Sequence, residues 1–137
     1  FPGGFQTTAR TWVDVPGASV TITVAESTSG VRVNCNAALG VSNQSAVPAN
    51  FGAAVRITRD GIESYKVPLF VSAPVGFTIE TPVEIAGTDF PGAGRHVYKL
   101  QLEVHPSSAV DTTAFVGFWD PAGTAAPGFM EAEETKR

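Results

Sequence analysis

The side chains that could do acid–base or metal chemistry are few, and their spacing separates them. The two histidines, His96 and His105, stand nine positions apart in one segment of alternating apolar residues. On a regular strand an odd spacing places two side chains on opposite faces, so we expect that this pair cannot share a metal ion. His96 begins the apolar face, where the sequence predicts a hydrogen-bonded residue at the core boundary. His105 precedes a proline at a solvated strand end.

The carboxylates form no evident catalytic pair. Glu80 and Glu84 share one face of a predicted strand, but four strand residues span about 13 Å, more than the carboxylates of a glycosidase require. No Gly-x-Ser-x-Gly motif is present, and the glycines at 92 and 94 precede a strand rather than a helix, which argues against a dinucleotide-binding loop. We therefore expect no catalytic residue, no metal and no cofactor, and predict that the chain is not an enzyme.

Cys35 is the one cysteine in 137 residues, which excludes an intrachain disulfide. It alternates in phase with Val31, Val33 and Ala37, so the sequence predicts a small buried core residue.

The charge balance limits the partners. A formal net charge of −4 provides no basic surface for nucleic acid or anionic lipid. No apolar run approaches the ~20 residues that span a bilayer. We expect neither nucleic acid nor a membrane as a partner.

The elements that must position these residues have a period of two. Apolar and polar residues alternate in segments separated by Gly, Pro and Asn, which is typical of short strands. The predicted strands cover residues 11–15, 19–26, 31–37, 53–59, 62–71, 77–85, 95–105 and 112–119. Their spacing predicts an all-β fold, an antiparallel β-sandwich or jelly roll of about eight strands over residues 11–119. A long loop is expected at 39–50, and Asp60-Gly61 predicts a tight hairpin turn.

The two ends differ from this domain. Residues 1–10 and 120–137 read as extended N- and C-terminal arms, rich in Gly and Pro near the aromatic side chains that they carry. Phe1, Phe5, Phe129 and Met130 would then be anchors that become ordered on a partner, because burial of the rings offsets the entropy lost by the chain.

The segment 114–119, AFVGFW, breaks the alternation and is apolar on both faces. Phe115 and Trp119 point one way, and Val116 and Phe118 the other. A strand of this kind needs cover on both sides. Either a neighbouring subunit supplies that cover, which would make these residues a subunit interface, or the chain's own 120–130 segment crosses it.

Trp12 shares its face with Asp14, so its ring is expected to point outward. An exposed planar ring is the feature that carbohydrate binding needs, which makes Trp12 the candidate glycan contact.

Residues 55–61, VRITRDG, and residues 91–100, PGAGRHVYKL, resemble trimeric jelly-roll domains of tailed-bacteriophage virion proteins. The resemblance covers mainly residues 53–119. It implies a jelly roll, threefold self-assembly and a structural or adhesive role in the virion without catalysis. The function it implies first is a capsid decoration protein that binds the major capsid protein at the capsid surface. The alternative is a fibre head or carbohydrate-binding module that attaches to a cell-surface glycan.

Overall fold

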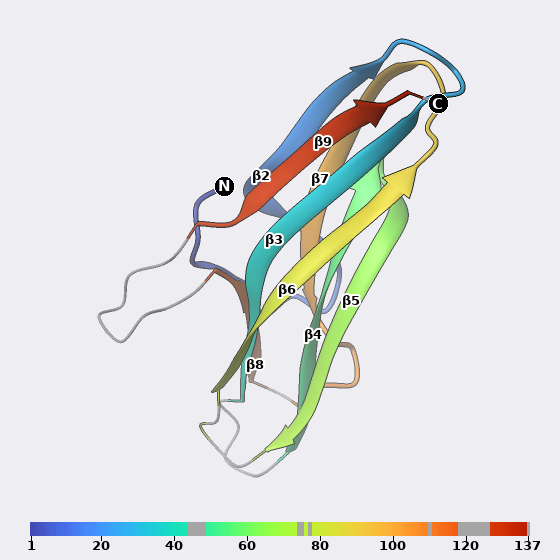
Figure 1. Cartoon of the computed structure of the whole chain (residues 1–137). Coiled ribbons are helices and arrows are strands. Elements are labelled where there is room, and N and C mark those ends of the chain that lie inside the picture. Colours follow the sequence, from blue (N-terminus) through green and yellow to red (C-terminus); the bar gives the residue numbers. More distant parts are fainter. Residues whose placement is uncertain (44–48, 74–75, 77, 110, 118–126, 137) are drawn as a thin grey trace.

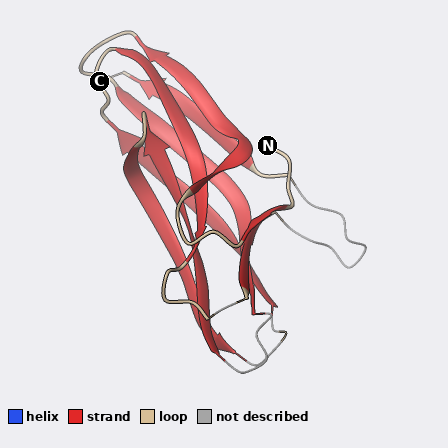
Figure 2. Ribbon diagram, turned by 180° about the vertical axis from the view of Figure 1, so that it is seen from behind, coloured by secondary structure: helices blue, strands red, loops and turns tan. Residues whose placement is uncertain are grey.

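The structure is a computed structural model that describes residues 1–43, 49–73, 76, 78–109, 111–117 and 127–136. The described residues form strands in two antiparallel sheets and no helix (Figures 1 and 2). The strands are β1 (Phe5–Thr7), β2 (Val13–Val24), β3 (Gly30–Asn43), β4 (Ala49–Arg59), β5 (Ile62–Ala73), β6 (Thr78–Asp89), β7 (Gly94–Val104), β8 (Thr112–Val116) and β9 (Phe129–Thr135).

The strand order confirms the predicted jelly-roll sandwich. One sheet has the order β1-β8-β3-β6, and the other has the order β2-β7-β4-β5. The chain changes sheet at each step from β1 to β4 and again from β5 to β8, and the β4–β5 hairpin stays within one sheet, as in a rolled-up hairpin. The ninth strand, β9, pairs with the first half of β3, and β8 pairs with its second half.

The core lies between the sheets and is filled by the inward residues of the alternating segments, as their period of two predicts. Val20, Ile22 and Val24 of β2 face it, with Thr21 and Thr23 exposed. Cys35 is buried among them, as predicted. The largest fully buried side chains are Tyr98, Phe51, Leu39, Ile57, Leu100 and Leu102.

Two boundaries differ from the sequence prediction. The segments at 11–15 and 19–26 are one strand, β2, whose pairing with β7 shifts between Asp14 and Ser19. Pro16 has no amide hydrogen and Gly17 has a φ of 76°, so the ladder is interrupted locally without ending the strand. The long loop expected at 39–50 is mostly strand, because β3 continues to Asn43 and β4 begins at Ala49.

The ends of the chain are not free arms, and this corrects the boundaries at 10 and 120. Near the N-terminus β1 pairs with β8, and near the C-terminus β9 pairs with β3 (Figure 1). The Phe1 amino group donates a hydrogen bond of 2.8 Å to the Gly128 carbonyl, and the Gly128 amide donates one of 2.9 Å to the Phe1 carbonyl. Both ends form backbone hydrogen bonds within the sandwich, which satisfies groups that an extended arm would leave to solvent.

Candidate functional site

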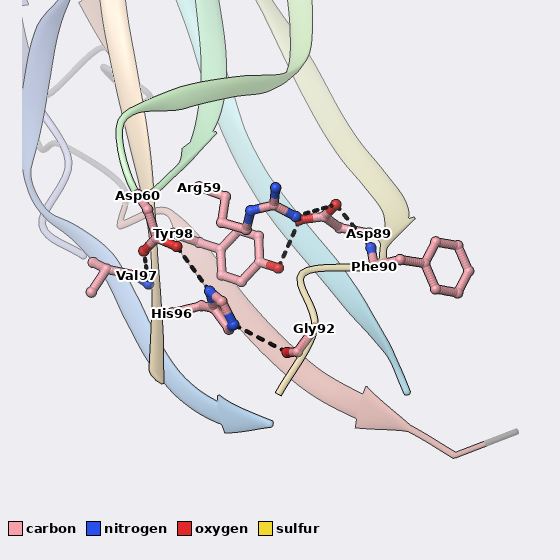
Figure 3. Close-up of polar contacts among 8 residues, drawn as sticks. All are labelled: Arg59, Asp60, Asp89, Phe90, Gly92, His96, Val97 and Tyr98. Atoms are coloured by element: carbon pink, nitrogen blue, oxygen red, sulfur yellow. Dashed lines mark hydrogen bonds and ion pairs between the residues drawn. The ribbon is translucent and has the colours of Figure 1, made fainter. Parts of the chain in front are cut away.

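The two segments that carry the family resemblance meet in the structure. Antiparallel pairing of β4 with β7 places Arg59 opposite Tyr98. The turn from β4 to β5 has positive φ at both central residues, 50° at Asp60 and 85° at Gly61, which confirms the predicted tight hairpin. The turn presents the Asp60 side chain toward the start of β7 (Figure 3).

Asp60 and His96 form a hydrogen-bonded pair at this turn. The His96 Nδ1 atom lies 2.8 Å from Asp60 Oδ2, and its Nε2 atom lies 3.1 Å from the Gly92 carbonyl oxygen (Figure 3). Both ring nitrogens therefore face acceptors, and only the doubly protonated imidazolium donates to both. Asp60 also accepts a hydrogen bond of 2.9 Å from the Val97 amide. The hydrogen bond from His96 and then that from Val97 lower the pKa of Asp60.

A second carboxylate, that of Asp89 at the end of β6, lies at the same end of the sandwich. Its oxygens both lie 2.8 Å from Arg59 Nη1, and the Tyr98 hydroxyl donates to Oδ2 at 2.9 Å (Figure 3). The Tyr98 residue is fully buried, and its desolvation, together with the hydrogen bond to Asp89, raises the pKa of its phenol far above the usual range. Tyr98 therefore stays a neutral donor and holds Asp89 in place.

Exposed apolar side chains flank this hydrogen-bonded end, here called the turn end (residues 59–62 and 89–98). Phe90 follows Asp89 and is 54% exposed, and Ile62 follows the turn and is 65% exposed. Figure 3 shows the Phe90 ring pointing away from the polar cluster. The turn end thus combines hydrogen-bonded side chains with two large apolar side chains that are each more than half exposed.

A hydrogen-bond chain crosses the outer face of the β2-β7-β4-β5 sheet. Asp14 accepts from Lys99 Nζ and from Gln101 Nε2, each at 2.7 Å. Gln101 in turn accepts from Arg56 Nε at 2.8 Å, and Arg56 Nη1 pairs with Glu63 at 3.0 Å. The hydrogen bonds from Lys99 and then Gln101 lower the pKa of Asp14, so this carboxylate is ionised at neutral pH.

A shallow depression of about 410 Å³ lies between this chain of hydrogen bonds and the turn end. Asp14 and Asp60 line it together with Lys99, Gln101 and Thr58. Sequence reasoning did not bring these residues together, because their meeting depends on the register of β2 and β4 against β7.

Two cationic side chains lie over the ring of Trp12, the predicted glycan contact. The Arg56 guanidinium carbon lies 4.4 Å from the ring centroid and Lys66 Nζ lies 5.2 Å from it. The residue is half-buried. A sugar that stacked where either cation lies would have to displace it, which makes the cation–π contacts competitors of the predicted role.

Glu103 is buried, although alternation with Leu102 and Val104 of β7 places it on the outer face of the sheet. It is 6% exposed, and this burial raises the pKa of its carboxyl, with Lys66 opposing the shift. A period of two shows only which face a residue takes; it does not show how deeply neighbours on that face cover it.

The structure describes two of the four residues predicted to form the subunit interface, Phe115 and Val116. Val116 is fully buried in the core, and Phe115 is 6% exposed, with its ring against Gly40 of β3. Both are therefore covered within the single chain, which corrects their assignment as an exposed subunit contact. Strand β8 lies between β1 and β3, so it has neighbours on both edges. Phe118 and Trp119 lie outside the described residues.

The predicted anchoring residues divide into two groups. Phe1, Phe5 and Met130 pack against the chain's own core, which corrects their assignment as anchors on free arms. Phe129 alternates with Met130 on β9 and is 50% exposed. The sequence pattern missed the pairing of β9 with β3 because it shows an alternating segment but not its partner strand.

The histidines take separate partners at opposite ends of β7. His96 binds Asp60 near the start of the strand, and His105, just beyond its end, accepts a hydrogen bond from the Ser107 amide at 3.1 Å. In the described part of the chain, no group of three or more His, Cys, Asp or Glu residues is placed to hold a metal ion. The same residues include no helix of the length and apolarity that crossing a membrane requires.

No protein-family model matches the chain, and no curated protein matches it.

Proposed function

We propose that the chain is a non-enzymatic structural protein of a virus particle, a trimeric decoration protein that binds the major capsid protein at the capsid surface and stabilises the lattice. The observation that carries this proposal is the arrangement of side chains at the turn end. The two segments of the resemblance bind each other there through Asp60 and His96, and two large apolar side chains are left exposed beside them.

The physical argument concerns the entropy of binding. The Asp60–His96 pair holds the turn against β7, and the Arg59–Asp89 pair holds the end of β6 against β4, before any partner arrives. A preordered surface loses less conformational freedom on association, so Ile62 and Phe90 can contribute their burial to affinity. Apolar side chains in such a place are suited to contact with another protein.

The first experiment measures the oligomeric state. Light scattering after size-exclusion chromatography is expected to give about three times the chain mass of 14.3 kDa. Replacement of Phe90 and Ile62 by aspartate tests whether the turn end contacts a subunit or the capsid. Dissociation of the trimer assigns these residues to the subunit contact; an intact trimer that no longer binds capsids assigns them to the lattice contact.

The second experiment locates the protein in its native particle. Antibody labelling of purified particles, viewed by negative-stain electron microscopy, is expected to mark the capsid surface. A monomer at micromolar concentration together with unlabelled particles would contradict the proposal.

The alternative function, a fibre head or carbohydrate-binding module, is favoured by a different observation. The depression between Asp14 and Asp60 is lined by hydrogen-bond donors and acceptors held in fixed orientation. Glycan binding by particles that carry the chain at a fibre tip, rather than on the capsid, would favour this alternative.

A further inference from the structure

The depression on the outer face of the β2-β7-β4-β5 sheet has the size of a small-ligand site. Its volume of about 410 Å³ lies within the ~300–1,000 Å³ of typical ligand pockets. Its walls come from three places in the sequence: Asp14 on β2, Lys99 and Gln101 on β7, and Thr58 near the end of β4 with Asp60 in the turn that follows. Strand pairing rather than a mobile loop sets the positions of Asp14, Thr58, Lys99 and Gln101.

The polar groups are oriented without a ligand. Lys99 and Gln101 hold the Asp14 carboxylate, each at 2.7 Å, and His96 and Val97 hold that of Asp60, at 2.8 and 2.9 Å. An ammonium group has three hydrogens, so Lys99 keeps donors beyond the one given to Asp14, and each carboxylate keeps lone pairs. The site therefore offers acceptors on two sides and a donor between them.

The charges select the class of ligand. Two carboxylates are ionised at neutral pH, and their hydrogen bonds lower the pKa of each further, so they disfavour a phosphate or a carboxylate ligand. The Lys99 ammonium, inside the same depression, disfavours a cation. A hydroxyl group suits the arrangement, since it donates to a carboxylate while it accepts from an ammonium.

We infer that the depression between Asp14, Asp60 and Lys99 binds a neutral saccharide unit through pairs of neighbouring hydroxyls. This inference deepens the alternative function, glycan attachment, and places it away from the Trp12 ring. It does not depend on trimer formation or capsid binding, so its failure leaves the decoration proposal intact.

The test is a titration of the ¹⁵N-labelled chain, followed by NMR, with the methyl glycosides of glucose, galactose, mannose and N-acetylglucosamine. At least one is expected to give saturable shifts in the amides of Gly61, Val97, Lys99 and Gln101. Lys99→Met and Asp14→Ala are each expected to weaken binding about tenfold or more, because each removes a charged hydrogen-bonding group.

Lys66→Met is the matched control. Lys66 lies on the same sheet face but contacts Trp12 instead of the depression, so its removal is expected to leave the affinity unchanged. Thermal melts show whether each variant folds. Absence of saturable shifts with all four glycosides overturns the inference. Shifts that Trp12→Ala abolishes and Lys99→Met leaves intact also overturn the inference, because they would place the saccharide at the Trp12 ring.

Discussion

The Nδ1 atom of His96 lies 2.8 Å from Oδ2 of Asp60, and this contact fastens the β4–β5 turn to the start of β7. The two residues are 36 positions apart: Asp60 lies in the turn that follows β4, and His96 lies on β7. The pair explains how a two-residue turn, exposed at one end of the sandwich, keeps a defined position.

The Asp60 carboxylate is expected to make stability depend on acid pH. Its pKa in the folded chain is lower than the ordinary value of 3.8, so its contribution is fully present above that value and is lost as the pH falls through the folded pKa. Asp60→Asn should therefore lower the melting temperature at neutral pH, and the difference from the parent should shrink below about pH 4.

Asp111→Asn is the control for that measurement. Asp111 also has a positive φ, 63° against 50° for Asp60, so both substitutions test the same backbone requirement. A pH-dependent difference as large for Asp111→Asn as for Asp60→Asn would show that the His96 contact is not its source.

Gly40 is expected to tolerate no side chain, because the Phe115 ring lies against its backbone. A Cβ atom there would overlap the ring, so Gly40→Ala should lower the free energy of unfolding by about 1–3 kcal/mol in urea titrations. The loss should be smaller when Phe115 is first replaced by leucine, since the smaller side chain leaves room. Equal losses in both backgrounds would contradict this packing.

Neighbouring residues of β9 should respond differently to truncation. Met130 packs against the core, so Met130→Ala is expected to reduce the free energy of unfolding by about 1–3 kcal/mol. Phe129 is 50% exposed, and Phe129→Ala should change it by less than about 0.5 kcal/mol. Urea unfolding of the two variants measures the difference; the reverse order would mean that β9 presents its other face to the core.

Removal of residues 127–137 is expected to destabilise the whole sandwich. It would expose the edge of β3 from Gly30 to Asn36 and remove the partner of Phe1. An uncovered strand edge promotes association between chains, so the shortened protein should aggregate on heating. Sizing and thermal melts would check this. An unchanged melting temperature would restore the interpretation of the C-terminal segment as a passive arm.

Cys35 is expected to react slowly with thiol reagents in the folded chain. It is 2% exposed, and burial raises the pKa of its thiol to about 12. Because the thiolate is the reactive form, labelling with a disulfide reagent should be about 100-fold slower or more than at a cysteine introduced by Ser107→Cys at an exposed loop position. Similar rates at the two positions would contradict the buried placement.

The sequence by itself determined the fold class and much of the core. Alternation at Val20, Ile22 and Val24 predicted which side chains face inward, because a strand places successive residues on opposite faces. Asp60-Gly61 predicted its own turn, since the residues that adopt positive φ are few. These properties depend on neighbouring residues in the chain, so local sequence patterns are enough to predict them.

The tertiary structure alone decided which distant residues meet. The pairing of β9 with β3 turned a predicted arm into a strand, and the register of β7 against β2 and β4 gathered Asp14, Lys99 and Asp60 around one depression. Register and partner choice arise from packing of the whole core and from closure of open sheet edges. An alternating segment matches many partners equally well, so its sequence does not identify the one against which it packs.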